Sequence, residues 1–208
     1  SDGGAQAMAV VNGGLAVVTS RDTIIVIPLA GGSRNTIPIQ ELDTSLASWN
    51  DNAWDRSYVD TSYTHDVAVG PDGLLYMNSS INNTAGAVGQ EGSAIISVDP
   101  TTGASWVIHA TLLPDACLGG GSGEDLIDSL AVAADGTIAF VRPLQPRICT
   151  VKVGSGATVL ADDGSVSGDG GDGGPALAAS FRFTGGGGDI DTSDLAFDAA
   201  GNLLVLDE

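Results

Sequence analysis

Four hairpin-like segments recur along this chain, and their repetition constrains the fold more than any other feature of the sequence. Each segment is a short apolar run, a turn that contains Gly, and a second apolar run. The four segments are residues 9–18, 68–77, 131–140 and 196–205. Their turn glycines are 59, 63 and 65 residues apart, and we expect each to adopt the positive φ that a tight hairpin requires: Gly14, Gly73, Gly136 and Gly201.

A second pair of apolar runs follows each of the first three hairpins, within residues 23–39, 94–109 and 148–160. Four antiparallel strands in about sixty residues are the content of one blade of a β-propeller. No segment longer than nine residues shows helical periodicity, so we predict an all-β chain. Residues 1–208 are expected to form a single partial or split β-propeller of about three and a half four-stranded antiparallel blades. The expected blades are 5–42, 65–110, 128–161 and the incomplete 194–208.

The half blade at the end of the chain bears on the partners that we expect. A propeller closes its ring by pairing strands from both termini within one blade, and three and a half blades cannot close in this way. Two accounts follow from the sequence. Either the remainder of the propeller lies outside this sequence, or a second copy of the chain completes a seven-bladed ring.

The charge balance limits the classes of partner. The chain carries 26 Asp and Glu against 7 Lys and Arg, for a net charge of −19. Such a field repels polyanions, so we expect no nucleic-acid partner. No run of 18 apolar residues exists, so we expect no membrane insertion.

The cysteine count and the loop composition bear on the compartment. The only two cysteines are Cys117 and Cys149, which form either one loop-to-strand disulfide or two buried thiols. Low Lys content, an acidic balance and loops rich in Asn, Gly and Thr favour a secreted or cell-surface protein. We therefore assume that a signal peptide has been removed, since the N-terminus carries no basic region followed by an apolar one.

Two stretches near the C-terminus carry a resemblance to a known family. Residues 168–181 read Gly-Asp-Gly-Gly-Asp-Gly-Gly-Pro-Ala-Leu-Ala-Ala-Ser-Phe, and the last hairpin follows within residues 194–207. This pattern resembles the NHL-repeat β-propeller family of the bacterial, secreted type, in which a similar linker leads into the inner strand of the next blade. The resemblance implies a propeller fold. Some NHL-like propellers are lyases that place a histidine on each of several blades around a zinc ion, and here only His65 holds such a position.

Antiparallel connectivity sorts the loops onto two faces. The connections between strands one and two of each unit are tight turns, whereas the long segments 40–64, 78–93, 111–127 and 161–193 all fall on the opposite face. Binding residues concentrate on loops held by a rigid scaffold, so we predict that this long-loop face binds a ligand. The alternative is that the long segments have no function.

The first long loop concentrates aromatic and acidic side chains. Flat apolar rings beside carboxylates suit a sugar, a cationic ligand or a protein partner. Alternatively, the two tryptophans anchor a long loop that would otherwise be entropically costly. The residues predicted to bind a ligand in this loop are Trp49, Asp51, Trp54, Asp55 and Tyr58.

A second candidate site lies where the inner strands begin around the axis. The residue three positions before each inner-strand alanine is Gln6, His65, Asp128 or Ser193, and Asp66 and Asp194 adjoin this ring. We predict His65 and Asp128 as ligand-binding residues and His65, Asp66 and Asp128 as a metal site, whereas the alternative makes His65 an ordinary polar residue. The Asp- and Gly-rich run 162–173 also offers oxygen ligands for calcium, but it lacks the spacing of a calcium-binding loop. No cofactor is certain from the sequence, and calcium or another divalent cation is the one that these residues suggest.

The sequence favours a binding module over an enzyme. The leading interpretation is an extracellular NHL-like β-propeller that recognises a protein, peptide or glycan through its long-loop face. The alternative is a propeller-type lyase or lactonase-like hydrolase with a divalent cation at the central axis. A purely structural spacer is a third interpretation.

Overall fold

The computed structural model describes residues 4–19, 22–40, 42–43, 64, 66–82, 91–110, 117, 127–142, 147–161, 170–171, 173–181 and 194–206. The first sheet contains β1 (Ala5–Val11), β2 (Gly14–Thr19), β3 (Thr23–Pro28) and β4 (Asn35–Pro38). The second contains β6 (Val67–Val69), β7 (Leu75–Asn82), β8 (Glu91–Val98) and β9 (Ser105–Ala110), with β5 (Leu42–Asp43) at its outer edge. The third contains β10 (Leu130–Val132), β11 (Ile138–Arg142), β12 (Arg147–Val151) and β13 (Thr158–Ala161). The last pair is β14 (Asp194–Phe197) and β15 (Leu203–Leu206), preceded by a 3₁₀ turn, η2 (Ala176–Ala178).

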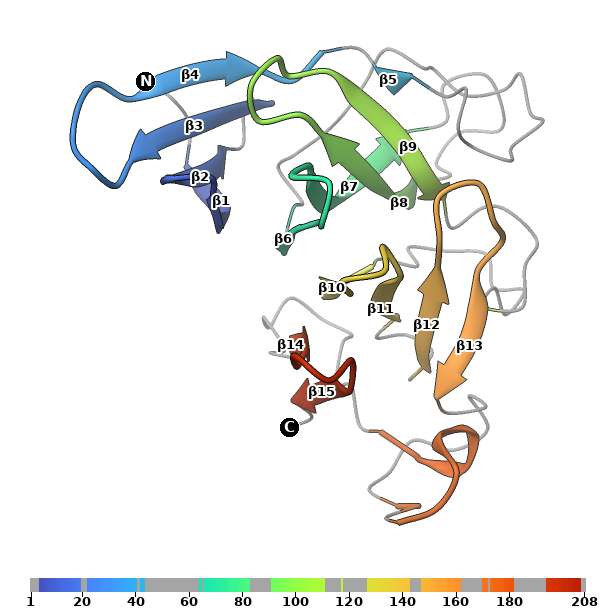
Figure 1. The fold of residues 1–208 in the computed structure, drawn as a ribbon. Helices are drawn as coiled ribbons and strands as arrows, with labels where there is room; N and C mark the ends of the chain where they lie inside the picture. Colours follow the sequence, from blue (N-terminus) through green and yellow to red (C-terminus); the bar gives the residue numbers. More distant parts are fainter. Residues whose placement is uncertain are drawn as a thin grey trace.

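The four sheets are arranged as consecutive blades around one axis. We number them blades 1 to 4 in chain order, with β14 and β15 as the described part of blade 4. Figure 1 shows β1, β6, β10 and β14 toward the centre of an open arc, with β4, β9 and β13 at its periphery. The inner strands contact one another in sequence, β1 with β6, β6 with β10 and β10 with β14. The predicted all-β fold, with four hairpins lining a shared axis, is therefore confirmed.

The blades stack because their strands are apolar on both faces. Side chains alternate between the two faces of a strand, so a sheet that is apolar on both sides needs a neighbour on each side. Val18 and Ile24 of blade 1 share a buried cluster with Met77 of blade 2. The next cluster joins blades 2 and 3, and a third joins Val141 of blade 3 to Leu195 of blade 4.

The turns of the inner hairpins follow the prediction in three units and differ in the first. Gly73, Gly136 and Gly201 have φ of 81°, 79° and 84°, as expected. In the first unit the prediction for Gly14 is wrong, because the residue with positive φ is Gly13, at 72°. The register pairs Val11 with Gly14, which makes a two-residue turn and places Gly14 at the start of β2.

The second blade has longer middle strands than expected. We predicted a loop over residues 78–93, but β7 and β8 continue their pairing as far as Asn82 and Glu91. Polar residues can occupy these buried strand positions because the segment that leads into the next blade supplies hydrogen-bond partners for them. Asn78 Nδ2 donates to the carbonyl of Ile127 at 2.7 Å, and Ile127 N donates to Ser93 Oγ at 3.2 Å.

The connection between blades 1 and 2 runs along the outer edge of blade 2. Leu42, which we expected at the end of blade 1, instead pairs in parallel with Ser105 of β9. Gln40 N donates to the carbonyl of Gly103 at 2.8 Å, and Ser105 Oγ donates to the carbonyl of Gln40 at 2.8 Å. Gly103 has φ of 78°, and a Cβ there would collide with the carbonyl oxygen of Pro38. The close approach therefore requires glycine.

The two ends of the arc present apolar side chains to solvent. On blade 1, Met8, Val10 and Ile27 are 63%, 66% and 42% exposed, on the sheet face that points away from blade 2. On blade 4, Leu204 and Leu206 are 56% and 51% exposed, on the face that points away from blade 3. In both cases the opposite face of the same sheet is packed against a neighbour.

Interior and end positions should differ sharply in their contribution to stability. Phe140 is fully buried between blades 2 and 3, so Phe140→Ala should lower the free energy of unfolding by about 3–5 kcal/mol. Leu204→Ala, at an exposed position, should change it by less than about 0.5–1 kcal/mol. Urea unfolding followed by circular dichroism measures both, and equal losses would contradict the stacked arrangement.

Candidate functional site

The polar cluster at the start of the inner strands is centred on Asp66, which joins two blades. Asp66 directly precedes β6, and its Oδ1 accepts a hydrogen bond from Val67 N at 2.7 Å. Its Oδ2 accepts hydrogen bonds from Leu130 N at 2.9 Å and Ser129 Oγ at 3.2 Å, at the start of β10. Asp66 N in turn donates to Asn78 Oδ1 at 3.1 Å. One carboxylate thus holds the entrance of blade 2 against that of blade 3.

The environment of Asp66 favours its neutral form. Burial raises the pKa of this carboxyl above its ordinary value of 3.8, and the charge of Asp194 raises it further. The hydrogen bonds from Leu130, Val67 and Ser129 oppose this shift but do not cancel it. A carboxyl with a raised pKa near the axis of a propeller is a candidate for proton transfer or ligand contact.

The structure places other predicted axis residues near the same entrance. Asp194 repeats the local geometry of Asp66, because its Oδ1 accepts from the following amide, Leu195 N, at 2.8 Å. Asp128 N donates to the carbonyl of Val141 at 3.2 Å, at the start of β10. Gln6 lies exposed in β1.

The structure describes only two of the three residues of the predicted metal site. Asp66 and Asp128 both lie at this entrance, whereas His65 lies outside the described residues. Within the ranges that the structure describes, no group of three or more His, Cys, Asp or Glu side chains is placed to hold a metal ion. The site of His65, Asp66 and Asp128 stays a prediction.

The predicted aromatic loop also lies outside the described residues. This applies to every ligand-binding residue predicted there: Trp49, Asp51, Trp54, Asp55 and Tyr58. Their role stays a prediction.

The structure confirms the predicted disulfide. Cys117 and Cys149 are bonded, with their Cα atoms 6.2 Å apart, and both belong to the buried cluster between blades 2 and 3. Cys149 lies in β12, so the bond joins a segment between β9 and β10 to the third strand of blade 3. A structural disulfide indicates an oxidising compartment. In the described part of the chain, no helix has the length and apolar character needed to cross a membrane.

His109, the second histidine of the sequence, lies in β9, the outermost strand of the four in blade 2. It is buried in β9, and its ring centroid is 5.4 Å from that of Phe140 in blade 3. Its place between two blades makes it part of the packing.

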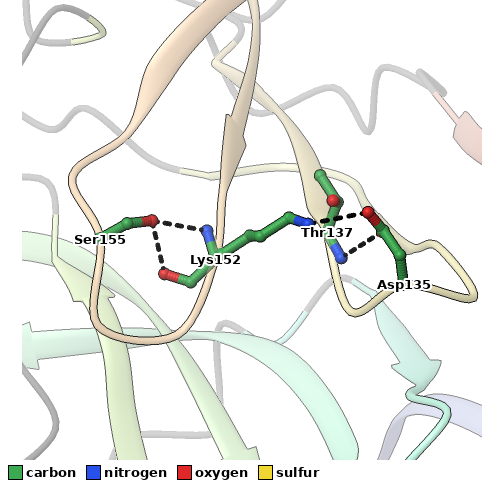
Figure 2. A network of polar contacts seen from close by, with 4 residues as sticks. All are labelled: Asp135, Thr137, Lys152 and Ser155. Atoms are coloured by element: carbon green, nitrogen blue, oxygen red, sulfur yellow. Dashed lines mark hydrogen bonds and ion pairs between the residues drawn. The ribbon is translucent and has the colours of Figure 1, made fainter.

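The sequence analysis missed the role of aspartates at the turns. Figure 2 shows Asp135, whose Oδ1 accepts from Thr137 N at 2.9 Å and whose Oδ2 accepts from Lys152 Nζ at 2.7 Å. The Lys152 ammonium and the Thr137 donors lower the pKa of Asp135. In the same figure, Ser155 Oγ donates to the Lys152 carbonyl at 2.8 Å and closes the neighbouring turn.

A similar arrangement occurs at one other inner-hairpin turn, where Asp72 Oδ1 accepts from Leu74 N at 3.1 Å and Asp72 Oδ2 accepts from Tyr76 Oη at 2.7 Å. At the last turn a different aspartate, Asp198 at the first position, accepts from Asn202 N at 2.8 Å. The signal in the sequence was the aspartate that precedes the turn glycine in the last three hairpins, directly before Gly73 and Gly136 and three residues before Gly201. Part of the acidity of the chain therefore stabilises turns.

Comparisons with known proteins agree with this architecture. A structure of glucose dehydrogenase aligns with 97% of this chain and 56% of its own, at a TM-score of 0.52 and 12% identity. The chain has the β-propeller fold. Virginiamycin B lyase from Staphylococcus aureus aligns at a TM-score of 0.44 and 11% identity, over all of this chain and 64% of its own.

A binding protein is also among the similar structures. An auxiliary nutrient binding protein from Bacteroides thetaiotaomicron aligns at a TM-score of 0.48 and 13% identity, over 93% of this chain and 42% of its own. The chain thus spans less than two thirds of each of these proteins. No protein-family model and no curated protein matches the sequence. Similarity of fold at this level of identity does not identify a function.

The raised pKa of Asp66 predicts a pH-dependent effect of Asp66→Asn. The folded state binds the Asp66 proton more tightly than the unfolded state, so the stability that protonation supplies is present at low pH. That stability is lost as the pH rises through the folded-state pKa. Asparagine does not titrate. The free energy of unfolding of the variant, relative to the unsubstituted protein, should therefore increase between about pH 3 and about pH 7.

Asp135→Asn is the matched control, because its effect on the free energy of unfolding should change with pH in the opposite direction. The pKa of Asp135 is lowered, so its charged form stabilises the fold above the ordinary value of 3.8, and this stability is lost as the pH falls. The relative stability of this variant should decrease over the same pH range. Urea titrations at both ends of the range measure both differences. A flat profile for Asp66→Asn, or one parallel to that of Asp135→Asn, would contradict the assigned effect of burial.

Proposed function

We propose that this protein is an extracellular, NHL-like β-propeller binding module that holds a protein, peptide or glycan on its long-loop face. The residues proposed to make the contact are those of the first long loop: Trp49, Asp51, Trp54, Asp55 and Tyr58. Tryptophan and tyrosine supply large contact areas at low entropic cost, and carboxylates orient polar ligands.

The observation that carries the proposal is the Cys117–Cys149 disulfide. It fixes a residue of the connection between blades 2 and 3, one of the segments predicted on the long-loop face, to the buried strand β12. Fixing a loop in advance lowers the entropy lost when a ligand binds, so it favours recognition by that face.

The same bond supports the proposed location. Disulfides persist in secreted and cell-surface proteins, whereas cytosolic thiols are kept reduced. The acidic balance and the NHL-like linker at residues 168–181 agree with a secreted bacterial protein. These features support the localisation independently of the ligand.

A glycan array and a displayed peptide library provide the test of this function. We expect the 208-residue chain to bind at least one glycan or peptide from these libraries. Trp49→Ala and Trp54→Ala should each weaken binding of that ligand by about tenfold or more. Calorimetry with the purified hit measures the loss.

Leu29→Ala is the control for this experiment. Leu29 is 66% exposed at the turn between β3 and β4, which lies on the face opposite the long loops. Its substitution should change the affinity by less than about twofold. Failure of both libraries to yield a hit, or a hit that both tryptophan variants still bind normally, would refute the proposed function.

A further inference from the structure

Asn78 is a buried residue of β7 that forms hydrogen bonds with two segments distant from each other in the sequence. Its Oδ1 accepts from Asp66 N at 3.1 Å, and its Nδ2 donates to the carbonyl of Ile127 at 2.7 Å. Its own carbonyl accepts from the buried Thr64 Oγ1 at 2.9 Å. One residue therefore holds the chain on both sides of β7.

Both segments are ends of the long connections that we assigned to the long-loop face. Thr64 ends residues 40–64, the first long loop, which contains the proposed ligand-binding side chains. Ile127 ends residues 111–127, the third long loop, which the disulfide ties to β12. Asn78 thus joins the end of the proposed binding loop to the end of the disulfide-tied loop.

The end of the third long loop has a second contact with blade 2. Ile127 N donates to Oγ of Ser93, a buried residue of β8, at 3.2 Å. The amide that bonds to Ser93 and the carbonyl that bonds to Asn78 belong to the same residue. Loss of the Ser93 contact should therefore loosen the Asn78 contact as well.

The internal repeat indicates that a blade does not require an amide side chain at this position. Thr19, Asn78 and Val141 each follow directly after one of the recurring hairpins, and all three are buried. The valine side chain forms no hydrogen bond, and its main chain holds the entering segment: Asp128 N donates to the Val141 carbonyl and Val141 N donates to the Ser129 carbonyl. A buried amide is costly unless it is hydrogen-bonded. An asparagine that the blade does not need is explained by the loop ends that it holds.

We propose that Asn78 is a positioning residue of the long-loop face, which couples the end of the first long loop to the end of the third. Through Asn78, the restraint that the disulfide places on the third loop is passed to the loop that carries Trp49 and Trp54. The two loops then act as one binding surface that spans blades 2 and 3. The first loop is the binding loop under the proposed function, on which this proposal rests, and the coupling is measured without a ligand.

Amide hydrogen exchange in the 208-residue chain, followed by NMR, tests the coupling. Ser93→Ala removes the acceptor of Ile127 N but does not alter the bond between Asp66 N and Asn78 directly. We expect Ser93→Ala to speed exchange of the Asp66 amide at least about fivefold relative to the Phe140 amide in the core.

A substitution at Asn78 completes the double-mutant cycle. Asn78→Asp keeps an acceptor for Asp66 N but replaces the donor to the Ile127 carbonyl with an oxygen. In this background, Ser93→Ala should change the exchange of the Asp66 amide by less than about twofold. A purely structural role of Ser93 would instead give the same change in both backgrounds.

Thr19→Val is the matched control. Thr19 holds the equivalent buried position in blade 1, and its hydroxyl forms a hydrogen bond with that of Thr23 at 2.6 Å. The substitution should change the exchange of the Asp66 amide, relative to that of Phe140, by less than about twofold. Circular dichroism checks that each variant folds, and Ser93→Ala decides the outcome alone if Asn78→Asp does not fold.

Acrylamide quenching extends the test to the proposed binding loop. Trp106→Phe leaves Trp49 and Trp54 as the tryptophans of the chain. In this background, Ser93→Ala should raise the quenching constant at least about twofold, because the first loop loses part of its restraint. The rise should be absent when Asn78→Asp is also present.

The proposal is overturned if Ser93→Ala leaves the exchange of the Asp66 amide or the tryptophan quenching unchanged, or if Thr19→Val speeds that exchange equally. These outcomes are distinct from those of the ligand libraries. Coupled exchange in a chain that binds no glycan or peptide would refute the proposed function and support the coupling. A ligand that depends on Trp49 and Trp54, in a chain without coupled exchange, would refute the coupling alone.

Discussion

The structure depends on the stacking of sheets that are apolar on both faces. Each blade leaves one apolar face for the blade before it and one for the blade after it, and the three buried clusters fill these interfaces one after another. Burial of apolar area is the main favourable term in folding, so the order of the blades along the chain sets their order around the axis. The polar contacts of Asp66 with Ser129 and Leu130 then fix the entrance of one blade against the next.

The stacking of apolar faces also explains why the two ends of the arc differ from its interior. Interior blades satisfy both faces, whereas Met8 and Val10 at one end and Leu204 and Leu206 at the other are exposed to solvent. Loops can diverge without disturbing the clusters, which suits a scaffold whose function resides in its connections. The disulfide ties one such connection to the core between blades 2 and 3. Recognition on the long-loop face would therefore leave the stack of blades unchanged.

The sequence predicted the parts of the fold that depend on periodicity. The recurring hairpins with glycine at Gly73, Gly136 and Gly201 located the inner strands, and the cysteine pair was correctly considered as a disulfide. The sequence-based prediction failed where contacts with distant segments override the local polarity of the residues. Asn78 and Ser93 were assigned to a loop because they are polar, yet Ile127 of the next blade gives them partners. The bridging role of Asp66 and the parallel pairing of Leu42 with Ser105 likewise depend on segments more than sixty residues away.

Amide hydrogen exchange at repeat-equivalent positions tests the central claim most directly. The backbone amides of Ile138 and Phe140 in β11 point toward β12, in the interior of the stack. Leu203 and Val205 hold the corresponding positions in β15, which pairs with β14 alone within the described residues of this 208-residue chain. The account predicts that the amides of Ile138 and Phe140 exchange orders of magnitude more slowly than those of Leu203 and Val205. Equal protection at the four positions would contradict it, because the edge of β15 would then already be paired.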